Sequence, residues 1–430
     1  MPFLHACYNV IVLPVLRAAV AIGRLSSAKV RSGLKGRDRL FDELARQCTA
    51  VENRTPRFWI HSSSMGEFEQ AKPVIEALKK AFPECVVAVS LFSPSAFDHV
   101  GNYPHADILT YLPLDTRANA RRFIKLIQPD VALTVRHDFW PNHLYTLQMR
   151  GIPSLLINCT VPDPLPKMMR HFPRAVRYVH GAFDAVLTVS KEAADYARQQ
   201  QWGRGPVQAV GDTRYDQVVF RAAQAEAIVA PLRRLKGQRQ GLVLGSSWPG
   251  DEAVIFEALG RLQKQQTLPF IVAAPHEPTE VHLSALEKQA AALNLKSCRL
   301  ADVNDQTDDV DVLLIDRIGI LASLYALGET AYVGGGFGVG IHNVLEPAAL
   351  GKAVLFGPKH HNSYEALQLK RRGVGFACPD VETLEAHLTA LYGDAHEREM
   401  LGRRAATLVR ENVGATGRIV EAVKEWLERP

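Results

Sequence analysis

Short apolar runs alternate with amphipathic stretches from residue 58 onward. Seven runs in the first half are rich in β-branched residues and bounded by Pro, Gly or Ser, which is typical of buried parallel strands. They are Phe58–His61, Val86–Phe92, Ile108–Leu114, Val131–Arg136, Ser154–Thr160, Val186–Ser190 and Val207–Gly211. Helical stretches at Phe68–Phe82, Ala118–Ile127 and Lys191–Gln201 lie between them, and Pro73 is expected to kink or end the first. The alternation predicts βαβ units.

The same pattern restarts after a polar, helix-prone connection around residues 213–240. The second set of predicted strands is Leu242–Ser246, Phe270–Ala274, Val312–Asp316, Thr330–Gly334, Ala353–Phe356 and Val374–Ala377. Helical sequence over Glu397–Glu428, with a break near Gly414–Gly417, follows them. We therefore predict an α/β chain of two Rossmann-like, doubly wound lobes with an interlobe cleft. Ligands bind beyond the carboxyl ends of the strands in such sheets, so the loops after strands are where a site is expected.

The N-terminal stretch Ala6–Gly23 is mostly apolar. Five basic residues follow before the first acid, Asp38: Arg24, Lys29, Arg31, Lys35 and Arg37. A spanning helix needs about 20 apolar residues, so this stretch is borderline. A signal peptide would place its charges before the apolar stretch. The pattern favours a membrane anchor or interfacial helix whose basic flank meets anionic lipid, and a helix packed on the body of the protein remains the alternative.

Charge and cysteine usage narrow the class of protein. The net charge of +5 is too small to indicate nucleic-acid binding. Six scattered cysteines, with no CxxC pair and no metal-ligand spacing, indicate reduced thiols in a cytoplasmic compartment. The sequence Asp309–Val310–Asp311 spells an Asp-x-Asp, but it opens an apolar strand among other acids, and we interpret it as solvated charge. No GxSxG, HExxH or kinase motif is present, and we expect neither metal nor cofactor.

The sequence HSSSMGE follows the first predicted strand and opens a helix. Glu67 falls in the first helical turn, where backbone amides and the positive end of the helix favour a charged carboxylate. An oriented carboxylate at the end of a strand is suited to act as a general base toward a hydroxyl. A capping role for Glu67 is the alternative, because glutamate is common at helix starts.

A glycine-rich loop, GGGFGVGIHN, follows the predicted strand Thr330–Gly334 and precedes a helix. Glycines let backbone N–H groups approach a phosphate, so this loop is a predicted phosphate site, whereas a plain glycine-rich turn is the alternative. It lacks the GK(S/T) of a Walker A loop and is not a GxGxxG, which argues against a dehydrogenase. Glu346 follows in the first turn of the next helix, where it would reach ribose hydroxyls.

Four other stretches end predicted strands and supply polar side chains. The sequences GSSW and PHEP end the first two strands of the second lobe, facing the same region as the glycine loop. Asp138 follows a first-lobe strand, where it would orient an acceptor hydroxyl or cap a helix. Arg214 lies at the junction of the lobes, where it would meet a substrate carboxylate or phosphate, or form an interlobe salt bridge.

Taken together, these stretches resemble one family, the 3-deoxy-D-manno-octulosonic acid (Kdo) transferases of lipopolysaccharide synthesis. Nine motifs occur in the family's order between about residues 61 and 358. They are HSSSMGEFEQAKPVIEAL, FSPSAF, YLPLDTRANARRF, DFWPN, RGIPSLLIN, GDTRYD, GSSWPGDE, APHEP and GGGFGVGIHNVLEPAALGKAVLFGP. The N-terminal apolar stretch and the GLKGR segment also resemble the family's anchor region.

The resemblance implies a GT-B fold and a metal-independent, inverting transfer of Kdo from CMP-Kdo to the lipid A precursor lipid IVA. Glu67 matches the family's catalytic base, and Asp138 matches an acidic position that is usually Glu, so its reach is shorter here. The predicted donor-binding residues are Ser246, Ser247, Trp248, Pro275, His276, Gly335, Gly336, Phe337, Gly338, Asn343 and Glu346. An enzyme of this family would work at the cytoplasmic face of the inner membrane, against an anionic lipid surface.

The resemblance also implies a division of the chain. We expect an anchor over residues 1–40, an acceptor lobe over 41–212, a linker over 213–240, a donor lobe over 241–400 and a C-terminal helix over 401–430. Two rival functions remain. Another GT-B transferase or a sugar-nucleotide epimerase would share the second lobe, although an epimerase needs no anchor. A membrane-attached binding protein without turnover would not need Glu67.

Overall fold

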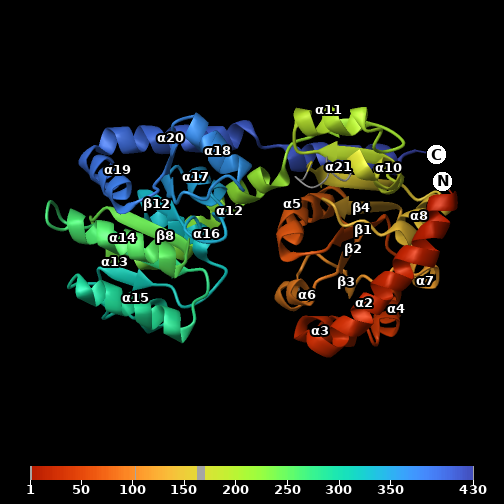
Figure 1. The fold of residues 1–430 in the computed structure, drawn as a ribbon, viewed down its shortest axis with the longest axis horizontal. Helices are drawn as coiled ribbons and strands as arrows, with labels where there is room; N and C mark the ends of the chain where they lie inside the picture. The colour runs from red at the N-terminus through yellow and green to blue at the C-terminus, as the bar shows by residue number, and fades with distance from the viewer. Residues whose placement is uncertain (1, 102, 162–169, 430) are drawn as a thin grey trace. The chain divides into compact units, whose positions relative to one another are not determined.

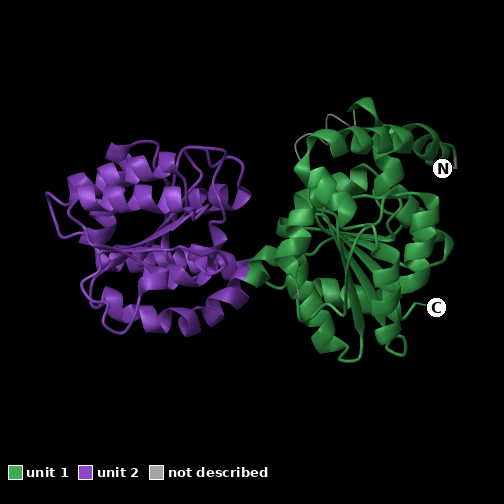
Figure 2. Ribbon diagram, turned by 90° about the horizontal axis from the view of Figure 1, so that it is seen from below, with its two compact units in different colours: residues 1–217, 413–430 green, residues 218–412 purple. Residues whose placement is uncertain are grey.

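The chain forms two α/β units, each built on a seven-stranded sheet whose neighbouring strands all run parallel (Figure 1). The computed structural model describes residues 2–101, 103–161 and 170–429. Unit 1 comprises residues 1–217 and 413–430, and unit 2 comprises residues 218–412 (Figure 2). The predicted pair of doubly wound sheets is confirmed.

The sheet of unit 1 has the strand order β3-β2-β1-β4-β5-β6-β7. Its strands are β1 (Arg57–Ser62), β2 (Val86–Leu91), β3 (Ile108–Tyr111), β4 (Val131–Val135), β5 (Ser154–Cys159), β6 (Ala185–Thr188) and β7 (Val207–Ala209). Chain order reverses between β1 and β4. This switch point is where a doubly wound sheet opens a crevice at the carboxyl ends of its strands.

Helices cover both faces of this sheet. Residues Phe58 and Ile60 of β1 face one core and Trp59 faces the other, as the period of two along a strand requires. The first core receives α5 (Met65–Ala81), α6 (Pro94–Val100) and α21 (Ala415–Leu427), and the second receives α4 (Leu40–Ala50), α7 (Arg117–Ile127), α8 (Pro141–Met149), α10 (Pro173–His180) and α11 (Lys191–Gln199). Of the two alternatives predicted for Pro73, a kink or a helix end, the helix end is wrong, because α5 continues through this residue.

The sheet of unit 2 has the order β10-β11-β9-β8-β12-β13-β14, with its switch point between β8 and β12. Its strands are β8 (Gly241–Ser247), β9 (Phe270–Pro275), β10 (Ser297–Arg299), β11 (Val312–Leu314), β12 (Thr330–Val333), β13 (Ala353–Phe356) and β14 (Gly375–Ala377). Helices lie on both faces (Figure 2). They are α13 (Arg233–Lys236), α14 (Pro249–Leu262), α15 (Glu280–Ala292), α16 (Leu321–Leu324), α17 (Leu345–Ala349), α18 (Tyr364–Arg371), α19 (Val381–Gly393) and α20 (Ala395–Glu411). Only the short, half-buried edge strand β10 was not predicted.

The chain passes between the units differently from the predicted division. Helix α12 (Thr213–Val229) begins in unit 1 and continues into unit 2, so the expected linker is a helix. The break predicted near Gly414–Gly417 is confirmed, because the C-terminal helical sequence divides into two helices. Helix α20 belongs to unit 2, whereas α21 packs beside α5 in unit 1. Asp216 fixes the start of α21 by accepting from the amides of Gly414 at 2.6 Å and Thr416 at 2.9 Å.

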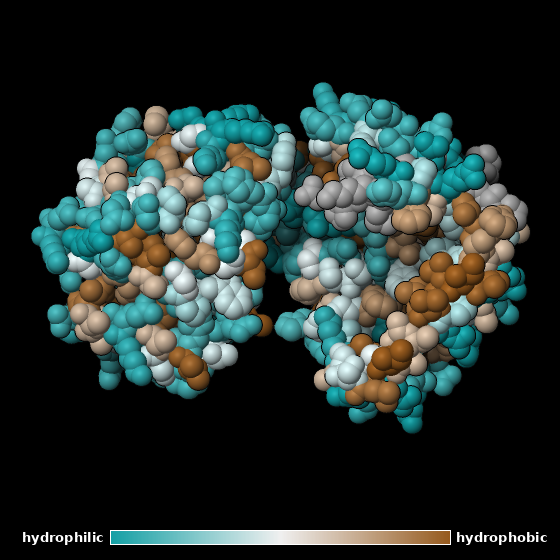
Figure 3. All heavy atoms as spheres, viewed as in Figure 1, coloured by the Kyte–Doolittle hydropathy of each residue, from teal (hydrophilic) through white to brown (hydrophobic). Residues whose placement is uncertain are grey.

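The N-terminal segment is helical through α1 (Pro2–Cys7), a π-helical turn at Tyr8–Val12 and α2 (Leu13–Ser26), followed by α3 (Ala28–Lys35). Residues Phe3–Ser26 are long and apolar enough, by length and composition, to cross a membrane. Figure 3 shows a row of hydrophobic side chains along α2. The large apolar residues exposed in this segment are Phe3, Val10, Ile11, Val12, Val15, Leu16, Ile22 and Leu25.

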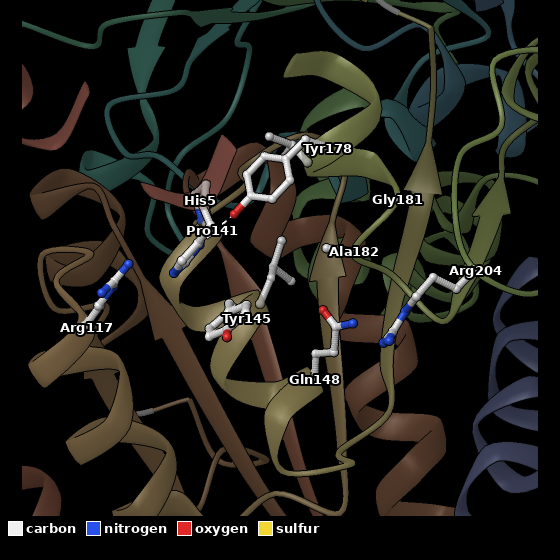
Figure 4. A pocket seen from close by; sticks show the side chains of 11 residues that line it. His5, Arg117, Pro141, Tyr145, Gln148, Tyr178, Gly181, Ala182 and Arg204 are labelled. Carbon is white, nitrogen blue, oxygen red and sulfur yellow. Dashed lines mark hydrogen bonds between the residues drawn. The ribbon is translucent and has the colours of Figure 1, made fainter. Parts of the chain in front are cut away.

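Polar contacts hold the beginning of this segment against unit 1. His5 bonds the Tyr178 hydroxyl at 2.6 Å and stacks on Tyr145, with ring centroids 4.2 Å apart. Figure 4 shows these rings together at one side of a hollow of about 510 Å³, with Arg204 and Gln148 at its other side. The segment is therefore docked on unit 1 at its start and apolar on its outer face.

Asp115 is the buried acceptor for a second contact of this segment. Its carboxylate accepts from the hydroxyl of Tyr8 at 2.8 Å, from the amide of Asn142 at 3.0 Å and from Nδ1 of His143 at 2.6 Å. Burial raises the pKa of Asp115, but these hydrogen bonds outweigh it and hold the pKa below its usual range. One carboxylate thus ties the N-terminal helix to the start of α8.

Candidate functional site

Glu67 and Asp138 both follow strands that flank the switch point of unit 1. Glu67 lies in the first turn of α5, just after β1, and Asp138 lies between β4 and α8. Strands β1 and β4 pair in parallel, with His61 opposite Thr134. The carboxyl ends of these strands, and the loops that carry the two acids, therefore share one edge of the sheet.

The carboxylate of Glu67 is positioned by the loop before its own helix. Its Oε2 accepts from the amide of Ser63 at 2.6 Å and from the hydroxyl of Ser63 at 2.7 Å. Ser64 caps the helix by accepting from the amide of Glu67 at 3.4 Å. The expectation that first-turn amides hold this carboxylate is wrong in detail, because Ser63 supplies both bonds from outside the helix. The side chain is half-buried, as a group meeting a substrate must be.

Asp138 belongs to a buried network rather than to a helix cap. Its Oδ2 lies 2.7 Å from Nε2 of His61 and accepts from the indole N–H of Trp140 at 2.9 Å. The other ring nitrogen of His61 meets the hydroxyl of Ser90 at 2.9 Å. Burial raises the pKa of Asp138, but the bonds from His61 and Trp140 more than offset it, so the pKa lies below its usual range. Asp138 is a fixed, charged acceptor at this edge.

Arg214 forms a salt bridge within unit 1. Its Nε and Nη2 lie 2.9 Å and 2.7 Å from Oδ2 of Asp212, and its amide donates to Oδ1 of the same carboxylate. The predicted role in holding a substrate anion is therefore weakened, because Asp212 already neutralises this guanidinium. This salt bridge joins residues two positions apart in unit 1, whereas the predicted alternative was a salt bridge between the lobes.

Three aromatic rings cluster at the switch point of unit 2. Trp248 follows β8, His276 follows Pro275 at the end of β9, and His342 follows the glycine loop. The ring centroid of His276 lies 4.7 Å from that of Trp248 and 4.4 Å from that of His342. The indole N–H of Trp248 donates to Nε2 of His342 at 3.0 Å. His342 was not among the predicted site residues, although it lies inside the GGGFGVGIHN motif.

The carboxylate of Asp251 binds backbone amides of the glycine loop. Fully buried, this carboxylate accepts from the amides of Gly335 at 2.8 Å, Phe337 at 3.3 Å and Trp248 at 3.0 Å. These two amides therefore already have a protein acceptor, so a phosphate at the predicted loop Gly335–Gly338 would have to bind other groups of the loop. The amide of Gly338 donates within the loop, to the carbonyl of Gly335 at 3.0 Å.

Packing explains part of the glycine content of this loop. Gly335 has φ +94°, which disfavours any other residue, and a Cβ on Gly336 would lie 2.5 Å from Gly357. Both positions are buried. The glycines thus bring β12 and its loop close to the neighbouring loop after β13, as well as leaving backbone exposed at Gly338.

A second buried acid lies next to Asp251. Glu252 accepts from the hydroxyl of Ser247 at 2.7 Å, and both of its oxygens lie 2.9 Å from Nε2 of His282. Ser247 is thereby committed to the protein interior, whereas Ser246 is partly exposed and has a left-handed φ of +51°. Of the two predicted serines, Ser246 is the one placed to meet a ligand.

The last two predicted donor residues lie at the start of α17. The side-chain oxygen of Asn343 accepts from the amide of Leu345 at 3.0 Å, and the residue is exposed. The carboxylate of Glu346 lies 3.6 Å from the guanidinium of Arg221. These residues lie after β12, the strand that pairs with β8 at the switch point.

The Asp-x-Asp sequence takes part in ion pairs away from both switch points. Asp309 pairs with Lys296, and Asp311 pairs with Arg239 at 3.0 Å. Among the described residues, no group of three or more His, Cys, Asp and Glu side chains is arranged to hold a metal ion. The carboxylates of this sequence act as partners of basic side chains.

Two Rossmann-like, doubly wound units are the architecture of the GT-B fold. Among solved structures, UDP-GlcNAc 2-epimerase from Neisseria meningitidis bound to UDP-GlcNAc aligns with a TM-score of 0.61 at 14% identity, covering 86% of this chain and all of that one. This likeness shows the fold.

Sequence comparison resolves the family within that fold. Residues 23–217 match the family model of 3-deoxy-D-manno-octulosonic-acid transferase (kdotransferase). The 3-deoxy-D-manno-octulosonic acid transferase of Bordetella pertussis is 26% identical over 382 residues, covering 86% of this chain and 87% of that protein. That of Aquifex aeolicus is 27% identical over 345 residues, covering 80% and 88%. The chain is therefore similar to Kdo transferases over most of its length, and residues 23–217 match the model of that family, which supports a glycosyltransferase of this kind.

Proposed function

We propose that the chain transfers Kdo from CMP-Kdo to lipid IVA, without a metal ion and with inversion at the anomeric carbon. The single observation that carries the proposal is the pair of hydrogen bonds from Ser63 to Oε2 of Glu67. They orient a half-buried carboxylate at the switch point, which is the arrangement a general base requires.

In the proposed reaction, Glu67 accepts the proton of an acceptor hydroxyl while that oxygen forms a bond to the anomeric carbon of Kdo. The bond from that carbon to the phosphate oxygen breaks, and CMP leaves with both electrons. Both bonds from Ser63 go to Oε2, so Oε1 is the oxygen we assign to the proton. Asp138, fixed by His61 and Trp140, would accept from a second hydroxyl of the acceptor and orient it.

We assign the donor nucleotide to the switch point of unit 2. The ring cluster of Trp248, His276 and His342 offers an exposed ring face, at His276, for stacking of the cytosine. Ser246 and the exposed loop at Gly338 are the proposed partners of the phosphate and sugar. Asn343 and Glu346 follow the glycine loop within a few residues, and we propose them as partners of the ribose hydroxyls.

We further propose that the protein works on the cytoplasmic face of the inner membrane, with the N-terminal segment lying in the lipid interface. Its docking through His5 and Tyr8 favours an interfacial helix over one that leaves the protein to span the bilayer. Arg24, Arg31 and Lys35 line one hollow of about 720 Å³ near α3, where anionic headgroups would bind. Arg37, by contrast, serves the fold, because it donates to three backbone carbonyls.

The test is a reaction of the purified protein with CMP-Kdo and lipid IVA in vesicles of anionic phospholipid, with excess EDTA. Mass spectrometry is expected to show lipid IVA gaining Kdo as CMP is released, and NMR of the product is expected to show inverted anomeric configuration. Sedimentation with vesicles lacking anionic lipid is expected to recover less protein. A folded protein that leaves lipid IVA unmodified would refute this function, and conversion of a sugar nucleotide without acceptor would favour an epimerase.

A further inference from the structure

We propose that an apolar groove in unit 1 binds one acyl chain of the lipid acceptor, with the chain running from Asp138 to the membrane. The inference rests on the proposed function, because it concerns the acceptor of that reaction. It adds a chain-binding subsite that selects acceptors by their acylation.

The groove has a volume of about 740 Å³ and lies between two helical walls. The N-terminal segment forms one wall, with Cys7, Val12 and Leu16, and α10 and the residue before it form the other, with Phe172 and Ala175. A volume of this size is typical of a small-molecule site. Its walls offer few hydrogen-bonding atoms, which a peptide backbone would need and a hydrocarbon chain does not.

One end of the groove reaches the candidate site. Asp138 lines it, and Phe139 continues the lining from the same loop. Since Asp138 is held by His61 at 2.7 Å, its position relative to the groove is fixed. A sugar hydroxyl bound at Asp138 would place an acyl chain on that sugar at the entrance of the groove.

The histidines that line the groove do not make it charged. His137 and His180 both contribute to it. Burial, chiefly, lowers the pKa of each to about 4, so both rings are neutral at pH 7. The lining therefore stays compatible with a hydrocarbon chain at neutral pH.

The other end of the groove is continuous with an apolar outer surface. Val12 and Leu16 line the groove and are also 45% exposed, and Phe172 is 65% exposed. Beyond them, Val15 and Leu25 expose apolar side chains on α2. Figure 3 shows a row of hydrophobic side chains along this helix. With α2 in the lipid interface, a chain could pass from the bilayer into the groove without crossing polar surface.

The first test narrows the groove at an exposed position. Ala175→Trp adds a ring to the wall without burying it in the core, and Ala6→Trp is the matched control, since Ala6 is exposed on α1 and does not line the groove. KM is measured for lipid IVA and for its chain-free disaccharide. Ala175→Trp is expected to raise KM for lipid IVA about tenfold relative to KM for the disaccharide, since each methylene excluded costs about fourfold in affinity. Ala6→Trp is expected to keep the wild-type ratio.

The second test measures whether lipid IVA occupies the groove, through the rate at which maleimide labels Cys7 in its wall. Of the six cysteines, Cys7 and Cys298 are the two that are not buried, so Cys298→Ser leaves Cys7 as the accessible thiol. In vesicles of phosphatidylglycerol, lipid IVA is expected to slow maleimide labelling of Cys7 by at least fivefold, and the disaccharide is expected to leave the rate unchanged. Both measurements use the full chain.

Three results would overturn the inference. An equal change of KM for both acceptors in Ala175→Trp would show that the groove does not bind the chain. Full protection of Cys7 by phosphatidylglycerol alone would assign the groove to bulk lipid. Protection by the disaccharide equal to that by lipid IVA would show that the sugar occupies it. If wild type transfers Kdo to neither acceptor, the proposed function itself fails, a result distinct from these three.

Discussion

Nε2 of His61 lies 2.7 Å from Oδ2 of Asp138, across the two strands that flank the switch point of unit 1. His61 is the second-last residue of β1, and the chain continues from there through Ser63 to Glu67 in the first turn of α5. The same strand end therefore fixes both acids, one through a ring nitrogen and the other through Ser63. This shared support explains how two carboxylates from distant parts of the sequence are held at one sheet edge.

Replacing His61 should alter the pH dependence of the reaction. His61→Phe removes a bond to a charged group, so kcat/KM is expected to fall about 10- to 100-fold. Because that bond lowers the pKa of Asp138, its loss raises this pKa. The acid limb of the profile of kcat/KM against pH should then move to higher pH. His99→Phe, the same change at an exposed histidine of α6, is the control, and superimposable profiles for His61→Phe and wild type would contradict the account.

Asp115 should stabilise unit 1 in a pH-dependent way. Its pKa is below the ordinary value of about 3.9, so its contribution is full above about pH 4 and is lost as the pH falls through the lower, folded value. Asp115→Asn is expected to cost about 2–3 kcal/mol at pH 7, because the bonds from Tyr8, Asn142 and His143 lose their charged acceptor. Urea unfolding from pH 7 to pH 3 measures the difference from wild type, which should shrink below pH 4.

The control for this prediction is Asp42→Asn, since the Asp42 side chain is 82% exposed. It is expected to unfold as wild type does throughout the range. A difference between Asp115→Asn and wild type that grows as the pH falls would have the wrong sign for a carboxylate whose pKa is lowered by folding.

Asp251 should determine how well the protein binds CMP. Asp251→Asn replaces one of the two acceptor oxygens with an NH₂ group. That group faces either the amide of Phe337 or the amides of Gly335 and Trp248, and the glycine loop must shift. We expect the Kd for CMP to rise about tenfold or more, because an unmatched buried donor costs about 1–3 kcal/mol. Calorimetric titration measures it. The control is Glu257→Gln, at an exposed position of the same helix, which should bind CMP as wild type does. An unchanged Kd for CMP in Asp251→Asn would show that the glycine loop takes no part in CMP binding.

The hydrophobic pattern predicted the strands well because most are buried on both faces and read as continuous apolar runs. Strand β10 escaped prediction because three half-buried residues at an edge carry no such run. The return of α21 to unit 1 also left no local signal. It depends on Asp216 meeting the amides of Gly414 and Thr416, a contact between positions about 200 residues apart.

The candidate site was predicted in outline because its residues follow strands at the two switch points. The sequence could not predict which polar groups form hydrogen bonds and salt bridges with one another inside the protein. Asp251 lies within the GSSWPGDE motif, yet its bonds to the Gly335 and Phe337 amides depend on the fold that brings β8 beside β12. Arg214 appeared available for a substrate until the fold placed Asp212 against it.

The most direct test of the central claim is the rate of Kdo transfer to lipid IVA by Glu67→Gln, compared with wild type and Ser63→Ala. Glutamine keeps the size of the side chain but cannot accept the proton. The account predicts a loss of about 10²- to 10⁴-fold for Glu67→Gln and about tenfold for Ser63→Ala, with the Kd for CMP unchanged in both. A Glu67→Gln variant that folds, binds CMP and transfers Kdo within a few-fold of the wild-type rate would contradict it.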